Sequence, residues 1–544
     1  MRHRWLWVLL AAVMCVGPAV AQEEEEEPDP AEVAIGERLF LETRFAQYFA
    51  ARAGGDVNAV LPAGDPVVST TATVNGSIPG PSAGQSINCR ACHLVDDVKE
   101  TAGGGNRSYA DFARQSPIPL REDGRTTTPR NSPSLVNASL SRGGPLFLHF
   151  DGEFSDAPAL VRGTLTGRNY GWLPSESETA ARQVALIVRG DDGTGTLAQA
   201  FGGSYRRVLA ATDPVIPAEL RLPRRFRVDV DEASDDEIVT AVSRLIAAYV
   251  ESLVFAHEDE VFDASPYDRF LTENHMPPAP DEHEPPTFYR ARLRTFLANA
   301  DDPTFVTDEL GPFALHAQPF VFGALELEGL RVFLDPRRGN CASCHVPPAF
   351  TDFRFHNTGV AQLDYDATHG AGAFAALTIP DRATRDRDPE AFLPASAPHP
   401  LAREPFRALV DPLRPGHVDL GVWNVYQNPD LAGARQQRRL DRLVCAAAER
   451  PAACRRRSAT DRLDAAIALF KTPGLRDLGH SGPYLHTGKA DTLEDVVRTY
   501  VEASELARAG TLRNGATELA RMRIGEADVE PLVAFLRALN EDYE

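Results

Sequence analysis

Long apolar runs, internal repeats and strand-like alternation are scarce in this 544-residue chain. After residue 21 no apolar run reaches the roughly 20 residues that a membrane-spanning helix needs, so no membrane span is expected. No segment recurs at the spacing of a solenoid, which excludes that class of fold. Few segments alternate apolar and polar residues as half-buried strands do, which argues against an all-β protein.

The first residues have the pattern of a secretory signal peptide. A basic head (MRHRW) precedes an apolar stretch (LWVLLAAVMCVG), and small residues follow it up to Ala21. A membrane anchor is the alternative, but the apolar stretch is shorter than the roughly 20 residues of a span. We therefore expect residues 1–21 to be cleaved on export and the protein to be periplasmic. Residues 22–31 (QEEEEEPDPA) predict an acidic, disordered leader.

Cations are too few to balance the acidic residues. The formal net charge is −21, and it falls to −23 when Arg2 and Arg4 leave with the signal peptide. Such a charge does not suit nucleic acid or an anionic membrane surface. It suits basic soluble partners such as small cytochromes, although solubility alone would also explain it.

The chain is too long for one hydrophobic core, because single cores stop growing at roughly 250–300 residues. Segments 32–40, 235–255 and 528–543 carry apolar residues at helical spacing and predict helices. The proline-rich stretch 276–286 (MPPAPDEHEPP) predicts a break between domains. The predicted order is an N-terminal domain over 32–275, a linker or insertion over 276–323 and a C-terminal domain over 324–544.

Four of the seven cysteines belong to two Cys-x-x-Cys-His motifs, 252 residues apart. This motif is typical of covalently attached haem c, because the two thiols add to the haem vinyl groups and the histidine binds the iron. A thioredoxin-type redox motif needs no histidine after it, and a shared zinc site with four thiolates is the remaining alternative. The motifs predict two haems attached at Cys89, Cys92, Cys341 and Cys344, with His93 and His345 as proximal ligands. Cys445 and Cys454 are expected to form a local disulfide.

Further segments carry a family resemblance. They are PRNSPSLVNAS (129–139), FDGEF (150–154), CASCHVPPAFTDFRFHNTGV (341–360) and FKTPGLRDLGHSGPYLHTGKADTLEDVVRTY (470–500). Together with the two motifs they resemble the dihaem cytochrome c peroxidase/MauG superfamily. The resemblance implies an all-α protein of two cytochrome c-like domains with long loop insertions. The first haem would be peroxidatic and the second would transfer electrons.

The resemblance covers about 33–261 and 324–540, so 277–323 and 365–465 look like insertions. Because the haem motifs lie outside 365–465, this segment is expected to be dispensable for haem attachment. The resemblance also implies a calcium ion between the domains, held by Asn131 and by the carbonyls of Ser481 and Pro483. A turn or cap role is the alternative for Asn131.

The sequence departs from the classical peroxidases around the first haem. Between Cys92 and Asn131 the only histidine is His93, so the distal side of this haem is expected to be open, as in MauG-type members. Phe150 occupies the position of the usual inter-haem tryptophan, which puts electron hopping there in doubt. Tyr170 and Trp172 are the nearest aromatic replacements in sequence, and core packing is their alternative role.

The distal acid/base residue is not evident. The stretch TGRNYGW lacks the glutamate of the peroxidases, so Glu176 or Glu178 would have to move the proton, unless both are solvated loop acids. Arg168 is a candidate for stabilising the departing oxygen by its charge. His149 is a weaker distal candidate, with a hydrogen-bonded structural histidine as the alternative.

The resemblance assigns Tyr500 as the sixth ligand of the second haem. Tyr500 lies fourteen residues after His486, where the classical peroxidases have methionine and MauG-type enzymes have tyrosine. A capping-box pattern at 492–495 starts the predicted helix that carries it. The alternative is a core tyrosine, with the iron open or bound by Met522. Besides Met522, only Met276 persists in the mature chain.

Three functions follow from these patterns. The first is a periplasmic peroxidase that reduces hydrogen peroxide with electrons from a small cytochrome c or cupredoxin, taken in through the second haem. The second is a MauG-like enzyme that uses peroxide-derived high-valent haem to oxidise a protein or small molecule. The third is a dihaem electron-transfer protein without catalysis. The resemblance favours the first, and a homodimer is compatible with the sequence.

The open distal side gives a spectroscopic prediction. If His93 is the only protein ligand of the first haem, the ferric protein as isolated should have a high-spin component that binds cyanide without prior reduction. Optical and EPR spectra before and after cyanide addition measure this. A fully low-spin spectrum for both haems would contradict the open site and point to a second ligand such as His149 or His257.

Overall fold

The computed structural model describes most of the chain. The described residues are 29–73, 76–80, 82–94, 107–108, 115–140, 146–254, 262–307, 313, 316, 318–431, 433–447, 451–458 and 462–541. The predicted signal peptide, most of the acidic leader and His257 lie outside them. Within them, no helix combines the length and the apolarity of a membrane span.

Helices dominate the described chain. They are α1 (Ala31–Phe40), α2 (Gln47–Arg52), α3 (Ala157–Leu165), α4 (Ser177–Gly190), α5 (Thr196–Ala200), α6 (Tyr205–Ala210), α7 (Asp235–Ser252), α8 (Pro266–Glu273), α9 (Pro286–Ala298), α10 (Ala324–Leu334), α11 (Val360–His369), α12 (Ala373–Ala376), α13 (Arg382–Arg387), α14 (Pro389–Phe392), α15 (Ala434–Ala447), α16 (Pro451–Arg456), α17 (Leu493–Ala509) and α18 (Val529–Arg537). The strands are β1 (Thr70–Thr73), β2 (Gly76–Pro79), β3 (His93–Leu94), β4 (Arg107–Ser108), β5 (Phe355–His356) and β6 (Phe470–Lys471). They form antiparallel pairs in sequence order, with Thr70 opposite Pro79, His93 opposite Ser108 and Phe355 opposite Lys471. The predicted helices at 32–40, 235–255 and 528–543 correspond to α1, α7 and α18.

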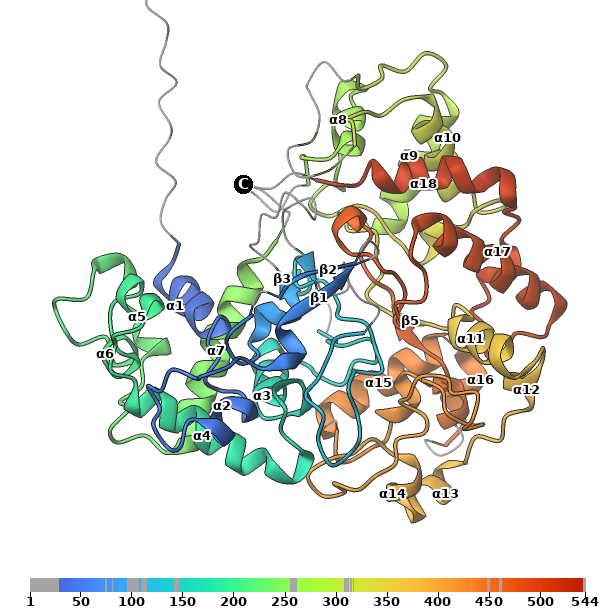
Figure 1. The fold of residues 1–544 in the computed structure, drawn as a ribbon. Helices are drawn as coiled ribbons and strands as arrows, with labels where there is room; N and C mark the ends of the chain where they lie inside the picture. Colours follow the sequence, from blue (N-terminus) through green and yellow to red (C-terminus); the bar gives the residue numbers. More distant parts are fainter. Residues whose placement is uncertain are drawn as a thin grey trace, which may run out of the picture.

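The first hydrophobic core is built from N-terminal helices, on the left in Figure 1. Helix α1 packs against α7 at Gly36, where a Cβ atom would lie 2.2 Å from the Leu245 carbonyl oxygen. Only glycine permits this approach. Helix α7 begins at a capping box, in which the Glu237 amide donates to Ser234 Oγ at 3.3 Å. The side chains of Cys89 and Cys92 pack against this core.

The second core joins α8, α9, α10, α17 and α18. Arg476 links the first helix of this core to the end of the chain. The Arg476 guanidinium binds Asp268 of α8 at 2.5 Å and Glu541 at 2.6 Å, and all three side chains are buried. Helices α8 and α9 therefore pack with the C-terminal half. The predicted division of domains stays a prediction, but this packing would place the boundary before residue 265.

A third core occupies the segment that looks like an insertion. Trp423, Leu440 and other buried residues of 365–465 pack with Phe147 of the N-terminal half and with Phe355 of β5. The Cys445–Cys454 disulfide links α15 to α16, which confirms the expected pairing. The segment is thus part of the folded body. Its removal would expose Phe147 and Phe355, so the packing argues against its being dispensable.

A buried ion-pair cluster joins the N-terminal half to this third core. Arg130 binds Asp419 at 2.5 Å and Asp151 at 2.7 Å, and Arg407 binds Asp151 at 2.7 Å and Glu153 at 3.1 Å. Burial alone would raise the pKa of Asp151, but the two guanidinium groups hold that pKa well below its ordinary value. The stabilisation is therefore present above the ordinary carboxyl pKa and is lost as the pH falls toward the folded value.

Removing one cation from this cluster should destabilise the protein. Arg407→Met leaves Glu153 without its arginine, and we expect the free energy of unfolding to fall by about 3 kcal/mol. Urea denaturation at neutral pH measures the loss. Arg414→Met is the matched control, because the Arg414 side chain is 68% exposed in its pair with Asp411, and a change below about 0.5 kcal/mol is expected there. Equal effects of both substitutions would show that the cluster contributes no stability of its own.

Candidate functional site

The first Cys-x-x-Cys-His motif forms a tight turn on the first core. Asn88 caps the 3-10 helix Cys89–Ala91, since its Oδ1 accepts from the Ala91 amide at 3.0 Å while its Nδ2 donates to the Leu41 carbonyl at 2.8 Å. The Cys89 sulfur lies 3.1 Å from the Tyr170 hydroxyl. Neither Cys89 nor Cys92 takes part in a disulfide.

The protonation of this motif suits haem attachment. Burial raises the pKa of Cys89 to about 11 and the pKa of Cys92 to about 12, so both remain thiols at neutral pH. Burial lowers the pKa of His93 to about 4, which leaves a neutral imidazole. Its Nδ1 atom is buried and has no hydrogen-bond partner in the described part of the chain. A neutral, incompletely paired imidazole beside two thiols fits a covalently bound haem.

The second motif also begins with a 3-10 turn, Cys341–Ser343, and Arg290 Nη1 donates to the Ala342 carbonyl at 2.5 Å. His345 Nδ1 lies 3.0 Å from the Phe350 carbonyl oxygen. Because a carbonyl only accepts, Nδ1 carries the proton and Nε2 keeps the lone pair that binds metal. Burial lowers the pKa of His345 and keeps the ring neutral. This motif therefore fits haem as well.

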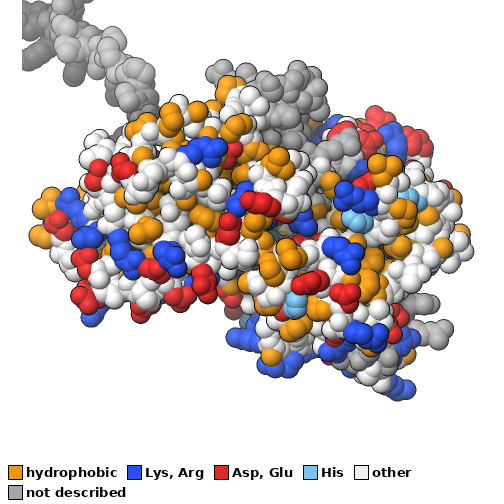
Figure 2. All heavy atoms as spheres, turned by 60° about the horizontal axis from the view of Figure 1, so that its bottom comes forward, with side chains coloured by type: hydrophobic (Ala, Val, Ile, Leu, Met, Phe, Trp, Pro, Cys, Tyr) orange, Lys and Arg blue, Asp and Glu red, His pale blue; other side chains and the backbone are white. Residues whose placement is uncertain are grey.

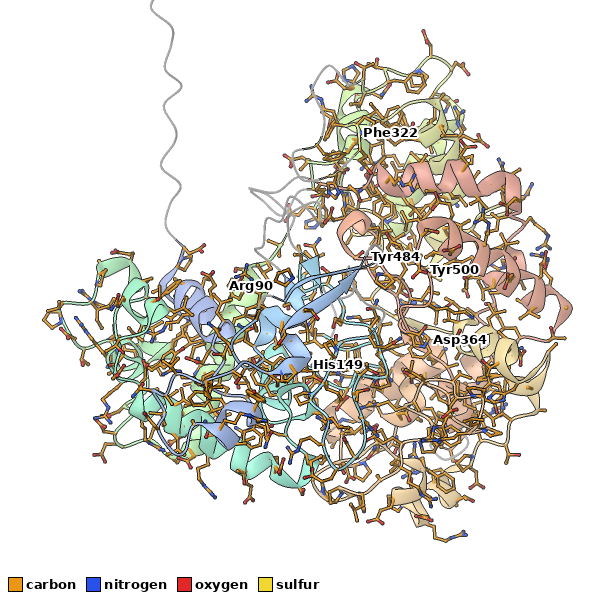
Figure 3. The ribbon with its side chains drawn as sticks, in the orientation of Figure 1. Arg90, His149, Phe322, Asp364, Tyr484 and Tyr500 are labelled. Carbon is orange, nitrogen blue, oxygen red and sulfur yellow. A yellow bond between two sulfur atoms is a disulfide. The ribbon has the colours of Figure 1, made fainter. Side chains whose placement is uncertain are left out.

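Tyr500 lies near the second motif. It projects from α17, whose capping box has the Asp495 amide donating to Thr492 Oγ1 at 3.1 Å (Figure 3). Burial raises the pKa of Tyr500, and interaction with Cys344 and Cys341 raises it further. No described residue forms a hydrogen bond with the Tyr500 hydroxyl.

Met522, the alternative ligand, is buried in the same core. The Met522 carbonyl accepts from Arg508 Nη1 at 2.6 Å. The core therefore contains both candidates. Tyr500 is close enough to both cysteines of the motif to interact with them electrostatically. Its role as the ligand stays a prediction.

Two of the expected calcium residues, Asn131 and Pro483, meet between the two halves. The Asn131 amide N–H donates to the His486 carbonyl at 2.8 Å, and Asn131 Nδ2 donates to the Pro483 carbonyl at 2.6 Å. Asn131 Oδ1 is buried without a partner among the described residues. A side-chain amide turned by 180° would place Oδ1 beside the Pro483 oxygen, and paired oxygens suit a hard cation. Ser481, two residues before Pro483, donates its hydroxyl to the Leu478 carbonyl at 3.4 Å.

Phe150 lies at the contact between the halves. Its carbonyl accepts from the Lys471 amide at 2.8 Å, and its ring centroid is 6.5 Å from that of His486. Phe470 stacks on the His486 ring, with 3.7 Å between the two ring centroids. The aromatic contact thus crosses from the N-terminal half to the segment that follows the third core.

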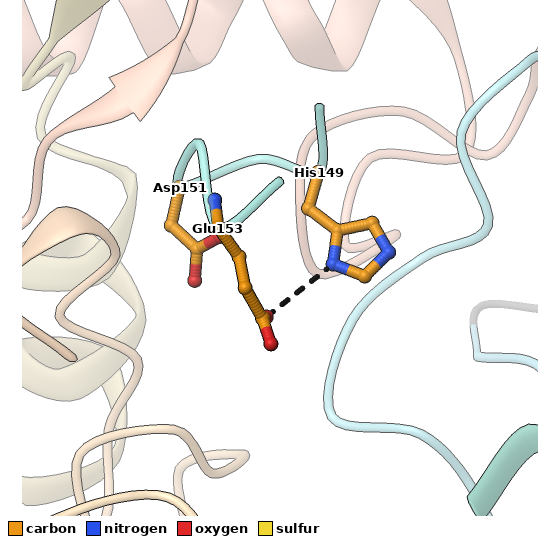
Figure 4. Close-up of side chains that lie close together, drawn as sticks. All are labelled: His149, Asp151 and Glu153. Atoms are coloured by element: carbon orange, nitrogen blue, oxygen red, sulfur yellow. Dashed lines mark hydrogen bonds and ion pairs between the residues drawn. The ribbon is translucent and has the colours of Figure 1, made fainter. Parts of the chain in front are cut away.

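His149, Asp151 and Glu153 converge beside Phe150 (Figure 4). Their potential ligand atoms lie within 4.8 Å of one another, and His149 Nδ1 is 3.5 Å from Glu153 Oε2. The carboxylates are already paired with the arginines of the buried cluster, so the group acts as part of an ion-pair network. His149 is also close enough to His93 to lower the pKa of that ring.

The distal candidates are held in surface ion pairs. Arg168 Nε binds Asp123 at 2.6 Å, while its Nη1 is buried and unpaired within the described ranges. Both Glu176 oxygens bind Arg121, at 2.9 and 3.0 Å. Burial alone would raise the pKa of Glu176, but Arg121 holds it below its ordinary value. This environment does not suit a proton donor, which needs a raised pKa.

Local sequence patterns indicated the roles of the aromatic residues only in part. Tyr170, two residues after Arg168, contacts the Cys89 sulfur. The only sequence signal for this contact was that Tyr170 lies in the segment GRNYGW. Trp172 is buried in the first core and donates to the Phe45 carbonyl at 3.2 Å, in keeping with a packing role. Arg407 and Asp419 were not anticipated, because nothing in the local sequence marks their long-range partners.

Comparison with known proteins gave short matches to curated sequences. The chain is 36% identical over 74 residues to the cytochrome-c peroxidase IdrP1 of Denitromonas iodatirespirans, which covers 14% of this chain and 18% of that protein. It is 36% identical over 73 residues to the methylamine utilization protein MauG of Methylorubrum extorquens, covering 13% and 19%. The matches thus span less than one fifth of either relative. No model of a protein family matches the chain.

Solved structures give a weaker likeness over a longer stretch. The dihaem peroxidase BthA of Burkholderia thailandensis has 16% identity and a TM-score of 0.42, with 95% of this chain and 87% of that chain covered. A MauG-like protein associated with microbial copper homeostasis has 14% identity and a TM-score of 0.42, with 95% and 91% covered. TM-scores this low do not by themselves establish a common fold. The curated matches, a cytochrome-c peroxidase and MauG, are the kinds of protein for which the superfamily expected from the sequence is named.

Proposed function

We propose that the protein is a periplasmic dihaem c-type peroxidase that reduces hydrogen peroxide, with electrons taken in through the second haem. The observation that carries the proposal is that each Cys-x-x-Cys-His motif lies on its own hydrophobic core, with two thiols and a neutral histidine. The sequence matches to a cytochrome-c peroxidase and to MauG support the same chemistry. Haem bound at these motifs would supply a redox-active iron that exchanges single electrons.

At the first motif, the protein would hold the haem and leave one side for peroxide. His93 is neutral and its Nδ1 atom is buried, which suits a proximal ligand. Arg168 Nη1 is buried and has no partner among the described residues, while Asp123 fixes the side chain, so this nitrogen would stabilise negative charge on a departing oxygen. Glu176 is less suited to donating a proton, since Arg121 keeps it ionised.

Between the motifs, Phe150 and His486 would provide packed contact without a readily oxidised side chain. Phenylalanine is harder to oxidise than tryptophan, so electrons would cross this contact without residing on residue 150. A calcium ion bound by Asn131 and the carbonyls of Ser481 and Pro483 would hold the two halves in register there. The buried, unpaired Asn131 Oδ1 supports this assignment.

The second candidate function is a MauG-like oxidation of a protein or small molecule. The position of Tyr500 beside the second motif favours it. A phenolate oxygen is a harder and more electron-donating ligand than a thioether sulfur, so it stabilises oxidised iron. A haem bound in this way is better suited to retaining oxidising equivalents than to rapid electron relay.

Steady-state kinetics tests the two functions against each other. The purified protein with both haems is mixed with reduced cytochrome c, and cytochrome oxidation is followed optically after hydrogen peroxide is added. We expect turnover that depends on peroxide. Slow turnover with a long-lived oxidised spectrum would favour the MauG-like function. The absence of any spectral response to peroxide would leave an electron-transfer protein.

Tyr500→Phe tests the ligand of the second haem. Loss of a phenolate ligand should change the ferric spectrum and raise the reduction potential of that haem, because the oxidised iron loses its hard donor. Spectroelectrochemistry measures both quantities. Met522→Leu is the control and should leave both unchanged. The opposite pattern, with an effect of Met522→Leu alone, would show that Tyr500 is an ordinary core residue.

A further inference from the structure

An arginine-rich hairpin stands out on this acidic protein. Residues 434–457, which contain α15 and α16, carry eight arginines and only two acidic residues, in a chain whose formal net charge is −21. The Cys445–Cys454 disulfide closes the hairpin. Figure 2 brings the lower part of Figure 1 forward, and Lys and Arg side chains gather along the lower edge of its right half, the side on which α13 to α16 lie.

Six of the seven described arginines of this hairpin are exposed to solvent. The exposed ones are Arg435, Arg438, Arg442, Arg455, Arg456 and Arg457, and no ion pair joins any of them to a described residue. Arg435, Arg438 and Arg442 recur at helical spacing on one face of α15. Like charges at these spacings repel one another, so the arrangement does not serve the stability of the helix. Elsewhere, arginines such as Arg130 and Arg407 are paired with carboxylates.

The buried face of α15 reaches the region between the two motifs. Gln436 Nε2 donates to the Gly152 carbonyl at 2.7 Å, and Gly152 is two residues from Phe150. Leu440 of α15 shares the third core with Phe355, which follows the second motif. A helix with its side chains is about 10 Å across. The exposed arginines are therefore separated from the inter-motif segment by roughly one helix thickness.

We propose that this arginine hairpin is the docking surface for a small acidic protein that carries electrons; the proposal rests on the peroxidase function above. Guanidinium groups bind carboxylates in bidentate fashion, and a local basic patch steers an acidic partner to one face. The acidic remainder of the chain repels the same partner elsewhere, which restricts docking to the hairpin. A flat anionic membrane would meet more of that acidic surface, so a compact protein fits better.

The test combines binding and kinetics, with plastocyanin as the probe, because it is a small acidic cupredoxin. The variant is Arg435→Gln, Arg438→Gln and Arg442→Gln together, since glutamine has nearly the helix propensity of arginine. The control is Arg182→Gln, Arg206→Gln and Arg224→Gln, which makes the same charge change at exposed positions of the N-terminal half. Titration calorimetry measures binding at low salt, and peroxide-dependent oxidation of plastocyanin gives kcat/KM.

We expect the hairpin variant to lower both plastocyanin affinity and kcat/KM by about tenfold or more, with a weaker dependence on salt. Turnover with hydroquinone, a small uncharged donor, should stay unchanged, and the control should lose less than about twofold. Equal losses in the two variants would overturn the proposal in favour of net charge. The proposal would also be overturned if the hairpin variant reacted normally with plastocyanin but bound phosphatidylglycerol vesicles more weakly. That result would indicate a membrane-binding surface. If the native protein binds plastocyanin at the hairpin but turns over no donor, docking stands and the peroxidase function fails.

Discussion

The buried contact between Arg130, Arg407 and the carboxylates of Asp151, Glu153 and Asp419 is the constraint on which the arrangement of the molecule depends. Charges removed from water must be paired closely, so the partners fix one another in position. Asp151 belongs to the segment that contains Phe150, and Arg407 and Asp419 belong to the third core. The network therefore holds the N-terminal half against the third core.

The segment that resembles an insertion is part of the packed interior of the protein. Residues 365–465 look like an addition to two haem domains, yet their buried residues pack with Phe147 and Phe355. Through Gln436, α15 also holds the backbone at Gly152. The buried face of this segment thus contacts the backbone near Phe150, and its opposite face is exposed to solvent. Helix α15 thus connects the backbone between the two motifs to an exposed surface.

Local patterns in the sequence anticipated the local parts of the structure. The helical spacing at 32–40 and 235–255 corresponds to α1 and α7, and the Cys445–Cys454 disulfide follows from proximity in sequence. Contacts between distant segments could not be anticipated in the same way. The ion pair between Arg130 and Asp419 could not be predicted from the local sequence, because each residue alone is indistinguishable from a solvent-exposed charge. Glu176 likewise read as a free loop acid, and its pairing with Arg121 depends on the folded loop.

The link from Arg476 to Asp268 and Glu541 bears on how the protein is assembled. The second core closes only when residue 541, 200 positions after Cys341, has joined α8. The first core has no such requirement, because its helices lie between residues 31 and 252. During synthesis the first motif can therefore lie on a finished core while the second motif is still part of an open chain. Under the proposed function, haem attachment would then follow chain order, with the second motif completed last.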